Sequence, residues 1–99
     1  MATLHLINRP ADAGAALSNC LRAVLDGDTV LLIGNGVFCA VADTLARIRV
    51  GKTELSWCAL SEDVVSRGIG ERIAPAIRLV DDETFVDLVA QHKPVVSWS

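Results

Sequence analysis

The sequence has few aromatic residues and no tyrosine at all. Of its 99 residues, 52% are hydrophobic but only 4% are aromatic. The core must therefore be aliphatic, built from Val, Leu, Ile and Ala. Such a composition argues against disorder and favours strands that are covered on both faces, as in a parallel sheet. The length predicts one domain, over residues 1–99.

Clustered positive charge is also missing. The net charge is −3, the isoelectric point is about 5.2, and Lys and Arg are scattered singly. Direct binding to nucleic acid is not expected, because it requires grouped cations. No apolar run approaches the roughly 20 residues that cross a bilayer. The N-terminus does not carry a basic segment followed by an apolar one, so we expect neither membrane association nor a signal peptide.

Cysteine is present in an odd number, at Cys20, Cys39 and Cys58. No pair has the CxxC spacing, and no cluster with histidine suggests zinc. We therefore expect reduced thiols in a cytoplasmic protein, with no metal and no cofactor.

The pattern of apolar and turn-forming residues predicts strands that alternate with helices. Expected strands are 3–7, 29–33, 54–59, 77–80 and 95–98. The first expected helix begins near residue 13 and ends at residue 27. Further helices are expected over 37–42, 43–50 and 61–66, and the last begins after residue 81. Asp12, Ser61 and Asp81 are the predicted N-caps. The short connections favour right-handed crossovers over a parallel sheet, in an α/β sandwich.

The turn Gly34-Asn35-Gly36 follows a strand and precedes a helix. A dinucleotide-binding fingerprint would have Gly or Ala where Cys39 stands. A turn that needs a glycine with positive φ is therefore the better interpretation. Ligands and partners of open α/β sheets collect at the carboxyl ends of strands, which makes Asn35 a candidate contact residue.

The cysteines allow two interpretations. Cys20 shares a helical stripe with Leu17 and Val24, which is typical of a buried and unreactive thiol. Cys39 is expected near the start of a helix, where the helix dipole would favour its thiolate. Cys58 lies within a predicted strand and is expected in the core.

Two further side chains stand out near the ends of the sequence. His5 lies within a predicted strand, where a histidine whose hydrogen bonds are satisfied in the core is the usual finding. Trp98 lies on the last predicted strand. A large apolar group there either seals the core or packs on a neighbouring chain.

Short segments along nearly the whole chain carry a family resemblance. They are Leu4-His5 with Asn8-Arg9, Leu31-Leu32 leading to Asn35-Gly36-Val37, Leu60 with Asp63 and Arg67-Gly68, Val80-Asp81 with Phe85-Val86-Asp87-Leu88, and Ser97-Trp98. In their order and spacing, these segments resemble the DsrH/TusB family of small sulfur-relay proteins. The resemblance implies a three-layer α/β/α sandwich with a five-stranded parallel sheet, as in DsrEFH-like domains.

The resemblance also implies partners. In that family the subunit joins DsrE/TusD-like and DsrF/TusC-like chains in a hexamer of two trimers. The complex passes persulfide sulfur to a DsrC/TusE-like carrier. The TusB branch serves 2-thiolation of the wobble uridine of certain tRNAs, and the DsrH branch serves sulfur oxidation.

The resemblance bears on individual residues as well. The principal sulfur-carrying cysteine of such complexes belongs to the DsrE/TusD-like partner, but the DsrH branch keeps a cysteine in its first helix, where Cys20 stands here. Members of that family usually have Asp directly before the glycine that corresponds to Gly36, where this chain has Asn35. They usually have Tyr two residues after that glycine, where this chain has Phe38.

The sequence thus predicts a subunit of a cytoplasmic sulfur-relay complex, at most an accessory to a sulfurtransferase. Cys20 is the candidate persulfide carrier, and Asn35, Gly36, Phe38 and Trp98 are the candidate interface residues. One alternative is an interaction module without chemistry, in which all three cysteines are core. Another is a small-ligand or nucleotide-binding protein that uses the turn at Gly34.

Overall fold

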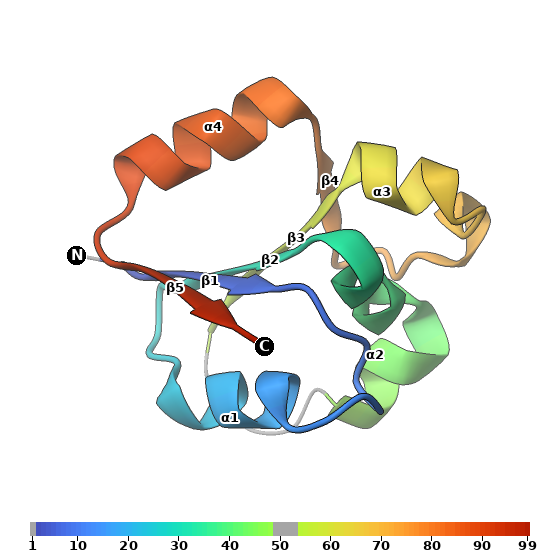
Figure 1. The fold of residues 1–99 in the computed structure, drawn as a ribbon, viewed down its shortest axis with the longest axis horizontal. Coiled ribbons are helices and arrows are strands. Elements are labelled where there is room, and N and C mark those ends of the chain that lie inside the picture. Colours follow the sequence, from blue (N-terminus) through green and yellow to red (C-terminus); the bar gives the residue numbers. More distant parts are fainter. Residues whose placement is uncertain (1, 49–53) are drawn as a thin grey trace.

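The computed structural model describes residues 2–48 and 54–99 and contains a five-stranded parallel sheet between helices (Figure 1). The strands are β1 Leu4–Ile7, β2 Thr29–Leu32, β3 Ser56–Leu60, β4 Arg78–Val80 and β5 Val95–Trp98. Their order across the sheet is β4-β3-β2-β1-β5, with every neighbouring pair parallel. The predicted three-layer α/β fold is therefore confirmed.

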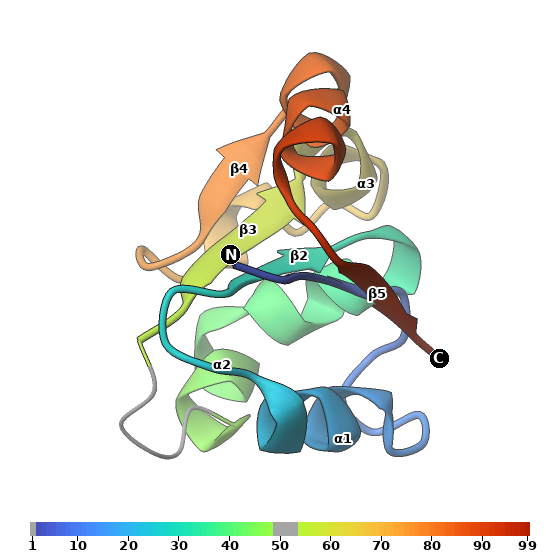
Figure 2. The ribbon, with the colours of Figure 1, turned by 90° about the vertical axis from the view of Figure 1, so that its left-hand side faces the viewer.

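Helices cover both faces of this sheet. They are α1 Ala16–Ala23, the 3₁₀ helix η1 Gly34–Ala40, α2 Ala42–Ile48, α3 Ser61–Ser66, the 3₁₀ helix η2 Gly70–Arg72, and α4 Asp82–Gln91. Figures 1 and 2 show α1 and α2 on one side of the sheet and α4 on the other. None of the helices in the described ranges has the length and the apolar character needed to cross a bilayer.

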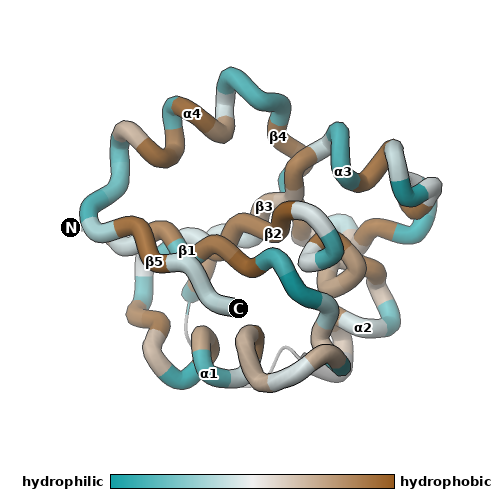
Figure 3. Tube along the Cα trace, in the orientation of Figure 1, coloured by the Kyte–Doolittle hydropathy of each residue, from teal (hydrophilic) through white to brown (hydrophobic). Residues whose placement is uncertain are grey.

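The central strand β2 is buried along its whole length, and its side chains point to two different cores. Val30 and Leu32 join the cluster on the α1 and α2 side, whereas Leu31 joins the cluster beneath α4. Phe85 and Leu88 of α4 close that second cluster. The tube coloured by hydropathy is accordingly apolar along the middle of the sheet (Figure 3). This two-faced burial is what the continuous aliphatic run predicts.

The helix starts differ from the sequence-based expectation in two of three cases. The N-cap of α1 is Ala15, without a side-chain hydrogen bond, so the predicted cap at Asp12 is wrong. Ser61 is the first residue of α3 and does not cap it. Asp81 does cap α4, because its carboxylate accepts a hydrogen bond from the Thr84 backbone N–H at 2.8 Å. The Asp81 cap is therefore confirmed.

The segment after β2 also differs from expectation. Helical structure begins at Gly34 itself, within η1, and not after the glycine turn. Gly34 has a φ of +52°, which confirms a glycine with positive φ in this turn. The next helix, α2, begins at Ala42. Residues 49 and 50 of the predicted helix lie outside the described residues.

Gly36 lies against the end of β1. A Cβ added to Gly36 would stand 2.1 Å from the carbonyl oxygen of Ile7 and 2.8 Å from its carbonyl carbon. Only glycine allows η1 to approach the β1 backbone so closely, because hydrogen is the only side chain that fits. The position of η1 at the carboxyl edge of the sheet therefore depends on this residue.

Replacing Gly36 by Ala is expected to destabilise the fold strongly, because the backbone at Ile7 must move. Forced overpacking of this kind costs about 1–3 kcal/mol or more, to be measured as the free energy of urea unfolding. Gly70→Ala is the matched control, since a Cβ there meets nothing within 4 Å. Equal stability of the two variants would contradict this account.

Candidate functional site

A polar network joins two helices, η1 and α3, at the carboxyl edge of the sheet. The Arg67 Nε–H donates to Asn35 Oδ1 at 3.0 Å, and one guanidinium N–H of Arg67 donates to the Asp63 carbonyl at 3.2 Å. The Asp63 carboxylate accepts from the Gly34 backbone N–H at 2.7 Å. The network thus ties the start of η1, after β2, to α3, after β3. A neutral amide at Asn35 is sufficient for this role, because it only has to accept from Arg67.

The same network bears on nucleotide binding. In a phosphate-binding turn, the backbone N–H groups at a helix start point to the anion of the ligand. Here the Gly34 N–H is already occupied by the Asp63 carboxylate. A phosphate would have to displace an anion of the protein itself. This geometry favours the structural interpretation of the glycine turn.

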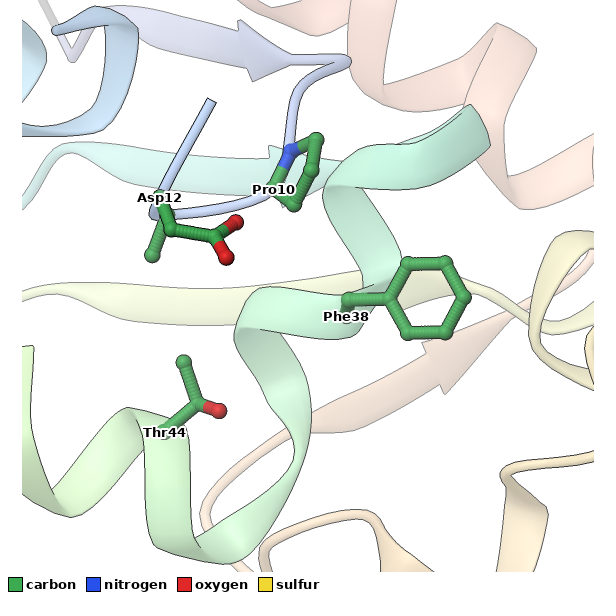
Figure 4. A pocket seen from close by; sticks show the side chains of 5 residues that line it. Pro10, Asp12, Phe38 and Thr44 are labelled. Carbon is green, nitrogen blue, oxygen red and sulfur yellow. The ribbon is translucent and has the colours of Figure 1, made fainter. Parts of the chain in front are cut away.

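Phe38 borders a shallow hollow beside this edge. The hollow has a volume of about 430 Å³ and is lined by Pro10, Ala11, Asp12, Phe38 and Thr44 (Figure 4). The Phe38 side chain is 38% exposed although it lies on a buried segment. Phe38 is thus one of the large apolar side chains that the structure leaves exposed.

A second polar network lies inside the molecule and is centred on His5. His5 is 3% exposed, and its Nε2 lies 2.9 Å from Asp28 Oδ2. The Trp98 indole N–H donates to His5 Nδ1 at 3.1 Å, and the two rings stack with centroids 6.1 Å apart. His5 therefore joins the turn before β2 to β5. The expectation of a satisfied core histidine is confirmed.

These contacts fix the proton of His5. An indole N–H can only donate, so Nδ1 must accept and Nε2 must carry the hydrogen that Asp28 accepts. Burial by itself would raise the pKa of Asp28. The hydrogen bonds from His5 and from the Thr3 and Leu25 N–H groups outweigh it and lower that pKa below its ordinary value of 3.8.

Cys20 lies in the core on the α1 side and is 0% exposed. Burial, and secondarily the nearby negative charge of Asp28, raise the pKa of its thiol to about 12. A thiol can be activated by a histidine that acts as base. Both ring nitrogens of His5 already bind other groups, Asp28 and Trp98. His5 therefore has no nitrogen left for Cys20 in this conformation.

The other two cysteines are also buried. Cys39 is the penultimate residue of η1, not an early one, and its thiol faces the Arg9 carbonyl at 3.6 Å. Burial raises the pKa of Cys39 to about 11, so the expected dipole-favoured thiolate is wrong. Cys58 lies on β3 and belongs to the hydrophobic core, as expected, and burial raises the pKa of its thiol as well.

The structure gathers the predicted interface residues at one edge but gives them different surroundings. Asn35, Gly36 and Phe38 all lie on η1, and Trp98 ends β5, paired in register with Ile7 of β1. Their role as an interface stays a prediction. Among residues 2–48 and 54–99, no three metal-ligating side chains converge.

Asp28 was missed by sequence reasoning. It is one of the buried charged residues, 4% exposed, and its carboxylate is the hub that holds His5 and two backbone N–H groups. The available signal was its place directly before the largely apolar segment from Thr29 to Ile33, where a carboxylate needs partners to be buried.

A family model described as "DsrH like protein" matches residues 12–95 of the chain. The chain belongs to the DsrH family. The match covers α1 through the start of β5, and so includes the Asn35–Asp63–Arg67 network.

Curated relatives of this DsrH family member are named Protein TusB. One from Buchnera aphidicola subsp. Baizongia pistaciae is 31% identical over 97 residues, which is 96% of this chain and 99% of the relative. One from Escherichia coli K12 is 32% identical over 78 residues, covering 79% of this chain and 82% of the relative. The solution structure of protein Tm0979 from Thermotoga maritima is similar in fold, with a TM-score of 0.66 and 24% identity over 93% of this chain and 95% of that one.

Asp28→Asn is expected to lower the free energy of unfolding at pH 7 by about 1–3 kcal/mol, because a buried charged acceptor is lost. Since the pKa of Asp28 is lowered in the folded state, its contribution is present above about pH 4 and is lost as pH falls through that lowered pKa. The free energy of unfolding in urea, measured between pH 7 and pH 3, should therefore fall less with decreasing pH in the variant than in the original chain.

The control is Asp12→Asn, which alters an exposed carboxylate. It should leave both the stability at pH 7 and the acid dependence unchanged. An Asp28→Asn variant as stable as the original chain at pH 7 would contradict the role assigned to this carboxylate.

Proposed function

We propose that this chain is a non-autonomous subunit of a sulfur-relay complex and that it contributes contact surface, not a reactive thiol. The match of residues 12–95 to the DsrH family carries the proposal. In that complex, persulfide sulfur would pass through a DsrE/TusD-like subunit to a DsrC/TusE-like carrier. Relatives named Protein TusB favour the branch that serves 2-thiolation of the tRNA wobble uridine.

The burial of the cysteines supports a role without chemistry. A persulfide is transferred when a thiolate attacks the outer sulfur of a donor persulfide, which requires both access and thiolate character. Cys20 is fully buried and its pKa is about 12, so at neutral pH it has neither in this conformation. A relay through Cys20 would require α1 to move away from the sheet.

The surface of the chain supports a protein partner. Phe38 is half exposed beside the hollow at the carboxyl edge, and η1 is held there by Gly36 and by the Asn35–Arg67 hydrogen bond. A contact residue on a fixed segment loses little conformational freedom on binding. The negative net charge of −3 disfavours a direct contact with tRNA.

Affinity purification of the tagged chain from its own organism tests complex membership. We expect two further small α/β chains, one DsrE/TusD-like and one DsrF/TusC-like, in equal stoichiometry by native mass spectrometry. Recovery of the chain alone at physiological salt would contradict the proposal. Loss of 2-thiouridine from tRNA on deletion of the gene would support the TusB branch, whereas retained 2-thiouridine with impaired sulfur oxidation would point to the DsrH branch.

Incubation with a persulfide donor tests the chemistry. Intact-mass analysis of the folded chain should show no gain of a sulfur atom, and Cys20→Ala should support the same rate of sulfur transfer in the reconstituted complex. Cys58→Ala is the control for removing a buried thiol, since Cys58 is also in the core. A gain of one sulfur that disappears only in Cys20→Ala would instead make Cys20 a carrier.

A further inference from the structure

The strand β5 forms one edge of the sheet, and its outer side is unpaired. Among the strands that the structure describes, β5 is bonded to β1 alone. Figure 2 shows β5 at the margin of the molecule, with no described element beyond its outer side. Exposed edge strands are commonly shortened, but the four residues of β5 equal the length of the interior strands β1 and β2.

The two edges of the sheet differ in their protection against pairing with another chain. The opposite edge strand, β4, has three residues and carries the exposed cation Arg78. A short strand with a charged side chain discourages such pairing. By contrast, β5 has the sequence Val95-Val96-Ser97-Trp98, without a charge and without a proline. The edge at β5 therefore lacks the features that protect the edge at β4.

The hydrogen bonding to β1 determines which backbone groups of β5 point outwards. The Leu4 backbone N–H donates to the Pro94 carbonyl at 3.1 Å. Along a strand, the N–H and C=O groups of one residue point to the same side, and successive residues alternate between the two sides. Val96 therefore directs its backbone groups towards β1, whereas Val95 and Ser97 direct theirs away from the sheet.

We propose that β5 pairs with β5 of a second copy of this chain, in antiparallel orientation, so that one sheet continues across both copies. In the register centred on Val96, Val95 of each copy lies opposite Ser97 of the other. Each such pair can exchange both of its N–H···O=C hydrogen bonds. Every outward backbone group of β5 then has a partner. The inference goes beyond the function proposed above and does not depend on it.

The symmetry of this edge favours a second copy. Its two outward residues stand one on either side of Val96, so a twofold axis through Val96 makes the edge its own complement. Val95 and Ser97 are both exposed, and they lie on the sheet face of Leu4, beneath α4, where small side chains can stand opposite each other. The Lys93 ammonium groups of the two copies would lie at opposite ends of the joined strands, so they would not repel each other.

Sedimentation velocity on the purified chain, at concentrations up to about 1 mM, tests the pairing. We expect an equilibrium between monomer and dimer. Backbone amide exchange on the same samples should show protection of the Val95 and Ser97 N–H groups that rises with the fraction of dimer, because these donors are free only in the monomer. A chain that stays monomeric throughout this range would overturn the inference.

Ser97→Pro removes one outward N–H and places the proline ring on the open side of β5. It should weaken dimerisation by about tenfold or more, and it should leave the pairing with β1 intact, because the N–H of Ser97 points away from β1. Ser97→Thr is the matched control. It alters the same side chain but keeps the N–H group, and a β-branched residue suits a strand, so this variant should dimerise as the original chain does.

Val95→Lys is a second variant that does not alter the backbone. Val95 is 38% exposed, so lysine is tolerated in the monomer, and a lysine on an edge strand discourages pairing. It should weaken dimerisation as Ser97→Pro does, with thermal unfolding as the check that both variants fold.

A dimer that persists in both variants would place the contact elsewhere and overturn the inference. Protection of the Val95 and Ser97 amides only after a DsrE/TusD-like or DsrF/TusC-like chain is added would identify a different occupant and overturn it as well. Membership in a relay complex is tested separately by the affinity purification described above, so the two conclusions fail independently.

Discussion

The pairing of His5 with Asp28 and Trp98 connects the parts of the chain that are farthest apart in sequence. His5 stands on β1, Asp28 stands before β2, and Trp98 ends β5. Each polar atom of the imidazole has one partner, so the ring can be buried without an unsatisfied group. A buried carboxylate would be costly alone, and it is tolerated here because three donors converge on it. The network therefore fixes the positions of β2 and β5, the two strands that flank β1.

A second set of contacts fixes the opposite end of the strands. Gly36 lets η1 lie directly on the Ile7 carbonyl, and Asp63 and Arg67 hold the start of η1 against α3. Several residues that carry the family resemblance thus belong to two structural networks, with His5 and Trp98 inside the sheet and Asn35, Gly36, Asp63 and Arg67 at its carboxyl edge. Neither network presents a free nucleophile. Both networks therefore serve to hold the strands and the carboxyl edge of the sheet in place.

Sequence reasoning recovered the architecture because it depends on simple patterns. A continuous aliphatic run such as Val30 to Ile33 is typical of a strand covered on both faces, and Asp81 before an amphipathic segment is a strong cap signal. The wrong caps at Asp12 and Ser61 show the limit of this approach. A capping side chain must reach a particular backbone N–H, and this depends on backbone angles before the helix that composition does not reveal.

The site was harder to predict than the fold. The environment of Cys39 depends on where η1 begins, and the helix starts at Gly34, several residues earlier than expected. Asp28 could not be linked to His5 from spacing, since they are 23 residues apart and meet only through the register of β1 with β2. Contacts across a sheet follow from strand order, and strand order follows from the packing of the whole chain.

The place of β5 has a consequence for how the molecule folds. The last strand pairs with the first, and the Trp98–His5 contact spans 93 residues of sequence. Closing so long a loop carries a high entropic cost until the intervening strands and helices are in place. One edge of β1 therefore stays open while the rest of the sheet assembles. During that interval it offers backbone N–H and C=O groups to any extended segment nearby, including β5 of another molecule, so this topology permits exchange of the last strand between copies.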